Sequence, residues 1–111
     1  MGASKSDLFS ESQNEIALLA KAIGHPARVA ILHYLHASNT CINGDLVQEL
    51  GLAQATISQH LKALKDIGII QGSIEGTSIC YCINPEKWAL MSQLFGNFFG
   101  EYSKFQKTNC C

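Results

Sequence analysis

The sequence predicts a mainly helical α+β domain whose helices are interrupted once by a β-hairpin. Apolar residues recur at helical spacing over most of the 111 residues, but they alternate with other residues between positions 69 and 83. Glycine or proline stands at most of the predicted boundaries. The length suits one domain, so we expect a flexible N-terminus at 1–10, the domain at 11–107 and a cysteine-bearing tail at 108–111.

The first two helices are predicted on either side of Gly24. An apolar run with helical spacing precedes this glycine and consists of Ile16, Leu19, Ala20 and Ile23. Pro26 then suits the first turn of a second helix. That helix is apolar around much of its circumference, which is typical of a helix at the centre of a domain.

Two short helices are predicted next, over 44–50 and 54–66. Gly51 suits a left-handed stop at the end of the first. The second has one apolar face, formed by Ile57, Leu61 and Leu64. Two short helices joined by a tight turn that contains glycine predict a helix-turn-helix.

A β-hairpin and a long last helix complete the predicted domain. The hairpin is indicated by "IIQGSI" and "SICYCI" on either side of "EGT", where Gly76 is free to take a positive φ. A two-stranded wing directly after a helix-turn-helix predicts the winged helix-turn-helix fold. Pro85 opens the last helix, which carries a stripe at helical spacing: Leu94, Phe95, Phe98, Phe99, Tyr102 and Phe105.

This stripe predicts a homodimer that forms through the first and last helices. Charged residues make up only 15% of the chain, and a small domain with few charges is expected to hide apolar surface in a partner. Burying one aromatic ring contributes on the order of 1.5–3 kcal/mol, so a paired set would hold a dimer firmly. Packing of the stripe onto its own domain is the alternative.

The polar face of the helix at 54–66 has the chemistry of a surface that reads DNA. Amides and hydroxyls can read base edges while cations meet phosphates, and no acidic residue occurs from Gln54 to Lys65. A net charge of −1 does not exclude DNA binding, because phosphate contact needs only a local basic patch. The expected contacts to bases or phosphates are Gln54, Thr56, Ser58, Gln59 and His60, with charge supplied by Lys62 and Lys65. A helix pair that binds protein instead of DNA is the alternative from another class.

The run "HPARVAILHYL" followed by "GDLVQELGLAQATISQHLKALKDIGIIQGSIEGTSICYCINP" resembles the ArsR-type (ArsR/SmtB) repressors over roughly residues 15–105. "LAQATISQHLKALKDIGII" is similar to the family's recognition helix and its exit into the wing. The resemblance implies a homodimeric winged-helix repressor that occupies double-stranded operator DNA of a detoxification operon. It also implies that a metal or metalloid ion releases the repressor from this DNA.

The cysteines are expected to be free thiols in a reducing, cytoplasmic compartment. They are Cys41, Cys80, Cys82, Cys110 and Cys111. Their number is odd, and the N-terminus lacks the basic and apolar blocks of a signal peptide, so no disulfide framework is expected. The longest apolar run is far shorter than a membrane span.

We interpret Cys110 and Cys111 as the thiols that capture an inducer, with Cys41 either as a third ligand or as an ordinary residue at the start of a helix. Soft ions select thiolates, and arsenite or antimonite accepts two or three of them. Zinc sensors of the resembled family carry His ligands on the last helix, whereas no histidine follows His60 here. Asn43 stands where some arsenite sensors of the family place a second thiol.

Three alternatives to this interpretation remain open at the level of sequence. A terminal Cys-Cys pair can be incidental. A regulator of the same fold can instead sense thiol oxidants or persulfides through Cys41 and another thiol. Cys80 and Cys82 share one face of a strand, within reach of one ion, but we expect them to pack under the wing because free cysteines are commonly buried.

No catalytic apparatus is visible in the sequence. It has no phosphate-binding glycine loop, no Ser-His-Asp order and no paired carboxylates. We therefore expect a protein that is not an enzyme and requires no cofactor, and whose ligands are DNA, a second copy of itself and an inducing ion.

Overall fold

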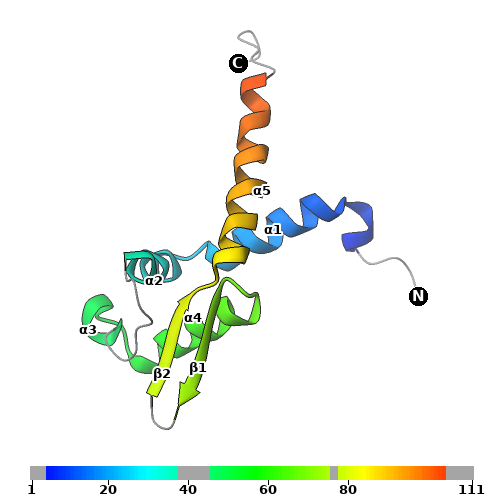
Figure 1. Cartoon of the computed structure of the whole chain (residues 1–111). Coiled ribbons are helices and arrows are strands. Elements are labelled where there is room, and N and C mark those ends of the chain that lie inside the picture. Colours follow the sequence, from blue (N-terminus) through cyan, green and yellow to red (C-terminus); the bar gives the residue numbers. More distant parts are fainter. Residues whose placement is uncertain (1–4, 38–45, 76–77, 105–111) are drawn as a thin grey trace.

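The computed structural model describes residues 5–37, 46–75 and 78–104 of the chain. A 3-10 helix (Lys5–Leu8) precedes five α-helices and one hairpin, arranged as shown in Figure 1. The elements are α1 (Glu11–Ile23), α2 (Pro26–Ala37), α3 (Leu46–Leu50), α4 (Gln54–Asp66), β1 (Ile70–Glu75), β2 (Ser78–Ile83) and α5 (Pro85–Lys104). The predicted α+β class, with a helix-turn-helix followed by a wing, is confirmed.

Local chemistry accounts for the helix boundaries. Ser10 and Gln13 form a capping box at the start of α1, since the Ser10 hydroxyl accepts from the Gln13 N–H at 3.1 Å and the Gln13 side chain accepts from the Ser10 N–H at 3.0 Å. Gly51 follows α3 with a φ of 68°, and Gly68 follows α4 with a φ of 88°. Only glycine adopts this left-handed conformation without strain, so both glycines stop their helices as predicted.

One apolar core joins the helices to the base of the wing. Its largest fully buried side chains come from α1, α2, α4 and the entry to the hairpin: Leu19, Ile31, Ile57, Leu64, Ile69 and Ile70. Met91 brings the first half of α5 into the same cluster. Helix α4 is therefore anchored to the rest of the domain along its whole inner face.

The wing is a two-stranded antiparallel sheet whose second strand lies beside α2. Its register pairs Ile70 with Ile83 and Gly72 with Tyr81. A Cβ atom built on Gly72 would collide with the backbone carbonyl oxygen of Cys80 and would lie 2.5 Å from Cδ1 of Tyr81, so only glycine fits here without a shift of the strands. Gly76, the predicted turn residue, lies outside the described residues.

The last helix extends well beyond the winged body, and α1 crosses it near its base (Figure 1). Of the predicted stripe, Leu94 and Phe95 pack against the core of their own domain. Phe98 and Phe99 remain 49% and 69% exposed. Packing onto its own domain therefore accounts for the base of the stripe, whereas Phe98 and Phe99 leave apolar surface on the part of α5 that lies beyond the core. Phe105 lies outside the described residues.

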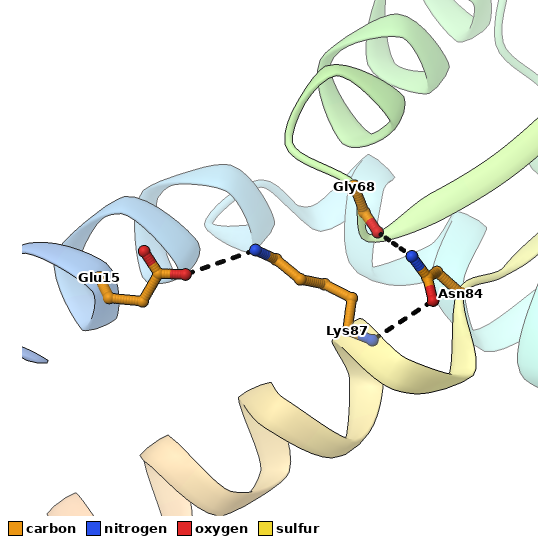
Figure 2. A network of polar contacts seen from close by, with 4 residues as sticks. All are labelled: Glu15, Gly68, Asn84 and Lys87. Atoms are coloured by element: carbon orange, nitrogen blue, oxygen red, sulfur yellow. Dashed lines mark hydrogen bonds and ion pairs between the residues drawn. The ribbon is translucent and has the colours of Figure 1, made fainter.

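A polar junction fastens α5 to both α4 and α1, as Figure 2 shows. The Asn84 side chain donates from Nδ2 to the carbonyl oxygen of Gly68 at 3.1 Å and accepts, through Oδ1, from the Glu86 and Lys87 N–H groups. Nζ of Lys87 lies 3.4 Å from Oε1 of Glu15 on α1. Asn84 is thus the N-cap of α5, and its side chain also connects the end of the wing to the residue that follows α4.

Candidate nucleic-acid interface

Helix α4, the predicted recognition helix, presents the predicted polar residues on the side opposite its buried face. Ile57, Leu61 and Leu64 are buried in the core. The exposed members of the predicted set are Gln54, Ser58, Gln59, Lys62 and Lys65, whereas Thr56 and His60 are half-buried at the edge of this face. The structure therefore brings all seven residues onto one element, five of them open to solvent.

The start of α4 is free of side-chain capping. Ala53 is its N-cap and makes no side-chain hydrogen bond, and the first helical bond runs from the Ile57 N–H to the Ala53 carbonyl at 3.1 Å. The N–H groups of the first turn therefore point outward at the positive end of the helix dipole, which favours a negatively charged group there. Beside them, Nε2 of Gln54 donates to Oγ of Ser58 at 3.1 Å.

The positive charge on this face is smaller than the sequence suggests. Nζ of Lys62 forms an exposed ion pair with Oδ2 of Asp66 at 2.8 Å, one turn further along α4. The hydrogen bond and the charge of that carboxylate raise the pKa of Lys62. The ammonium group therefore stays protonated, but the carboxylate offsets part of its positive charge. Lys65 has no ion pair within the described part of the chain.

His60 is more than a surface contact, since it ties α4 to the junction of α1 and α2. Its Nδ1 accepts a hydrogen bond from Nε of Arg28 at 3.1 Å, and its ring lies against the ring of His25 with centroids 4.5 Å apart. Arg28 also donates to the carbonyl oxygen of Ala22 at 2.9 Å. Desolvation, followed by the charges of His25 and Arg28, lowers the pKa of His60 below its ordinary value of 6.5.

This cluster changes what His60 can offer to DNA. The lowered pKa favours the neutral ring, and one of its two nitrogens already accepts a hydrogen bond from Arg28. Arg28 and His60 are 32 residues apart, so nothing in the local pattern of the sequence indicates their contact.

The predicted thiols divide into two groups. Cys41, Cys110 and Cys111, the proposed inducer ligands, lie outside the described residues. Cys80 and Cys82 are half-buried free thiols on β2. Tyr81 and Ile83 are the residues of this strand that pack against the core, so Cys80 and Cys82 lie on the opposite face and not under the wing as expected.

Within the described ranges, no three side chains of His, Cys, Asp or Glu gather closely enough to hold a metal ion. Nor does any helix there have the length and apolar character needed to cross a membrane.

Comparison with known protein families identifies this region of the chain. The model described as "Bacterial regulatory protein, arsR family" matches residues 25–71, which span α2, α3, α4 and the start of β1. The HTH-type transcriptional regulator YgaV of Escherichia coli K12 is 36% identical over 75 residues, covering 68% of this chain and 76% of the relative. The biofilm growth-associated repressor of Xylella fastidiosa Temecula1 is 33% identical over 86 residues, which is 77% of this chain and 75% of the repressor.

Solved structures show the same architecture. The transcriptional regulator HlyU of Vibrio vulnificus CMCP6 superposes with a TM-score of 0.62 at 28% identity, covering 80% of this chain and 92% of that one. The transcriptional repressor BigR of Xylella fastidiosa superposes with a TM-score of 0.63 at 26% identity, covering 96% of this chain and 100% of that one. Similarity therefore extends from the recognition helix to most of the domain.

Proposed function

The chain belongs to the arsR family of bacterial regulatory proteins, and from this premise we propose that it represses transcription by occupying operator DNA. Members of this family are transcriptional regulators and not enzymes. The observation that carries the proposal is the exposed face of α4, which is polar, has no carboxylate before Asp66 and lies opposite a buried face. This combination suits a helix that enters the major groove.

In the proposed complex, the exposed amides and hydroxyls of α4 meet base edges. Gln59 is the best placed of these residues, because Gln54 and Ser58 already share a hydrogen bond. Thr56 and the free nitrogen of His60 lie at the edge of the contact, while Lys65 and Lys62 meet phosphates. The wing at 69–83 follows the flanking backbone.

We propose that the DNA-binding form is a twofold dimer that pairs α1 and α5 of each protomer. The exposed rings of Phe98 and Phe99, together with Leu18 of α1, support this assembly because they leave apolar surface on both helices. Two recognition helices then fall about one turn of DNA apart and double the small basic contribution of each protomer.

We propose further that the inducer is a thiophilic ion, arsenite or antimonite. Cys110 and Cys111 would bind it, with Cys41 from the same or the partner subunit as a third ligand. Release from DNA requires the ion to favour one form of the dimer over another, since a ligand shifts an equilibrium only by its differential affinity. The support for this part is the thiophilic chemistry of the adjacent cysteines in the sequence.

DNA binding is tested by titrating the protein into a labelled duplex from the region upstream of its own gene, at several salt concentrations. We expect Gln59→Ala to reduce the free energy of binding to the operator by about 1–3 kcal/mol and to leave binding to an unrelated duplex almost unchanged. Lys65→Ala should weaken binding to both duplexes alike and reduce by about one the slope of log affinity against log salt concentration. Lys21→Ala removes a cation from α1 and serves as the matched control. Equal losses from the two lysine variants would argue against α4 as the reading surface.

The inducer is tested separately on the preformed complex. Arsenite should release the wild-type protein from DNA, and Cys110→Ser combined with Cys111→Ser should abolish this release while leaving DNA affinity unchanged. Release by peroxide or persulfide, with no effect of arsenite, would instead favour the thiol-sensing alternative. Persistent release from the double variant would remove the tail from the mechanism.

A further inference from the structure

The outward face of the wing carries two thiols with a regular spacing. Cys80 and Cys82 lie two residues apart on β2, and the intervening Tyr81 packs against the core with Ile83. Across the hairpin, Cys82 pairs in register with Gln71, and Cys80 pairs with Ser73. Nε2 of Gln71 lies 4.0 Å from Sγ of Cys82. The thiol pair therefore lies on the face opposite Tyr81 and Ile83, and Cys82 has a polar side chain beside it.

We propose that Cys80 and Cys82 form a two-thiolate binding site for trivalent arsenicals on the wing, separate from the terminal cysteines. Residues i and i+2 of a strand lie about 6.6 Å apart on the same face. Two thiols that lean toward each other from this spacing can bring their sulfurs close enough to share one ion. Both side chains are half-buried, so the site is accessible and its ligands are held in place by the strand.

The same spacing excludes an internal disulfide while the strand stays extended. A disulfide needs Cβ atoms about 3.5–4.5 Å apart and an S–S bond of about 2.05 Å. Two residues on one face of a strand are too far apart to meet the first condition. Mild oxidation therefore cannot close this pair within one wing, and both thiols stay available for an ion.

The surroundings of the pair decide which ligand fits. Among the described residues, no third His, Cys, Asp or Glu joins the two thiols, so these residues do not supply the four ligands of a closed tetrahedral zinc site. The amide nitrogen of Gln71 is a hydrogen-bond donor and not a ligand. An ion that takes two sulfurs from the protein and keeps a substituent of its own suits this set, as a monosubstituted trivalent arsenical does.

The binding step is a simple exchange. A hydrated arsenical, R–As(OH)2, forms two As–S bonds and loses two As–O bonds, and each oxygen leaves as water with one thiol proton. Arsenic remains trivalent, and no oxidant or reductant is consumed. Because the two sulfurs close a ring through the strand, the product should resist competing monothiols, whereas an arsenical held by one thiol should not.

Phenylarsine oxide is a suitable probe, because it offers two exchangeable positions. The folded, reduced full-length protein is treated with the probe, challenged with excess glutathione, and digested with trypsin for mass spectrometry. Cleavage after Lys65 and Lys87 gives the peptide Asp66–Lys87, which contains Cys80 and Cys82 and no other cysteine. Cys41 and the terminal pair fall in other peptides, so each thiol group is read separately.

We expect one phenylarsenic group on Asp66–Lys87 of the wild-type protein, and its loss from both Cys80→Ser and Cys82→Ser. The variant with Cys110→Ser and Cys111→Ser is the matched control and should retain the group. Circular dichroism checks that each serine variant is folded. An unlabelled Asp66–Lys87 in the wild-type protein, or a label that survives in either single variant, overturns the proposal. Neither result depends on DNA binding, so the proposed function is tested independently.

Discussion

Asn84 links the last helix to the end of the recognition helix, since its Nδ2 donates to the carbonyl oxygen of Gly68 at 3.1 Å. Its Oδ1 also caps α5, and Lys87 in the first turn of α5 pairs with Glu15 of α1. The last helix therefore contacts the end of the recognition helix through the Asn84 side chain, and Lys87 connects the last helix to α1 (Figure 2). A movement of α5 within the dimer would reach α4 by this route.

The first prediction concerns Asn84. Asn84→Ala removes both the α5 cap and the bond to Gly68, and it should lower the free energy of unfolding by about 1–2 kcal/mol. Asn84→Asp can still accept from the helix N–H groups but cannot donate to Gly68, so its loss should be smaller. Urea unfolding of the two variants at neutral pH measures both effects. Equal losses would mean that the cap contributes nothing.

The second prediction concerns Gly72 in the wing. Gly72→Ala places a methyl group against the backbone carbonyl oxygen of Cys80 and 2.5 Å from Cδ1 of Tyr81, and the strands must shift to accept it. We expect a loss of about 1–3 kcal/mol in thermal or urea unfolding. Gly96→Ala is the matched control, because a Cβ there meets nothing and the helix gains about 0.5–1 kcal/mol from alanine. A stable Gly72→Ala variant would contradict the packing of Tyr81 over this glycine.

Periodicity and breaker residues were sufficient to predict the fold. The recognition helix ends where Gly68 was expected to stop it, and α2 and α5 begin at the prolines that were expected to start them. These boundaries depend on the backbone conformations of single residues, which a sequence displays directly. The same holds for the polar face of α4, because a helix of 3.6 residues per turn fixes which side chains share a side.

Contacts between distant residues were not predictable in this way. Two hydrogen bonds, from Arg28 to His60 and from Asn84 to Gly68, join elements that only the folded chain brings together. The orientation of Cys80 was missed for a related reason. Alternation along β2 shows that the two cysteines share one face of the strand and that Tyr81 and Ile83 share the other. Which of these faces lies against the core is decided by packing with the rest of the domain.

The third prediction is a dependence of stability on pH that originates at His60. Its pKa is lowered in the folded state, so the unfolded chain binds a proton more readily and acid favours unfolding. The free energy of unfolding should therefore decrease as the pH falls below 6.5, and this contribution should be flat above it. His25 and Arg28 are the groups that face the ring.

Urea unfolding from about pH 8 to about pH 5 tests this dependence. His60→Gln retains an oxygen that can accept from Arg28 but cannot titrate, so its stability should fall less in acid than that of the wild-type protein. If both proteins lose the same stability on acidification, His60 is not the source.

The fourth prediction concerns the proposed dimer. The Phe99 ring is 69% exposed on α5, and burying one such ring contributes about 1.5–3 kcal/mol. Phe99→Ser should therefore weaken dimerisation strongly while leaving the fold of each protomer intact. Sedimentation velocity at several concentrations measures the change. Val29→Ser removes an exposed apolar side chain from α2 and should leave the dimer unaffected.

The last prediction concerns the charge of the recognition helix. Asp66 holds Lys62 in an exposed ion pair at 2.8 Å, which keeps part of the positive charge away from phosphates. Asp66→Asn should therefore tighten DNA binding several-fold at low salt and steepen the dependence on salt by about 0.9 for each additional phosphate contacted. Since exposed ion pairs contribute little to stability, unfolding should barely change.

Glu11→Gln makes the same change in net charge on α1, away from α4, and is the control for this prediction. Salt-dependent titrations of both variants against the same duplex distinguish a local effect from a global one. An equal gain in affinity from Glu11→Gln would show that net charge alone is responsible. A gain confined to Asp66→Asn places the Lys62–Asp66 pair beside the phosphate backbone, because a charge change raises the affinity and steepens its loss with salt only where it lies close to the duplex.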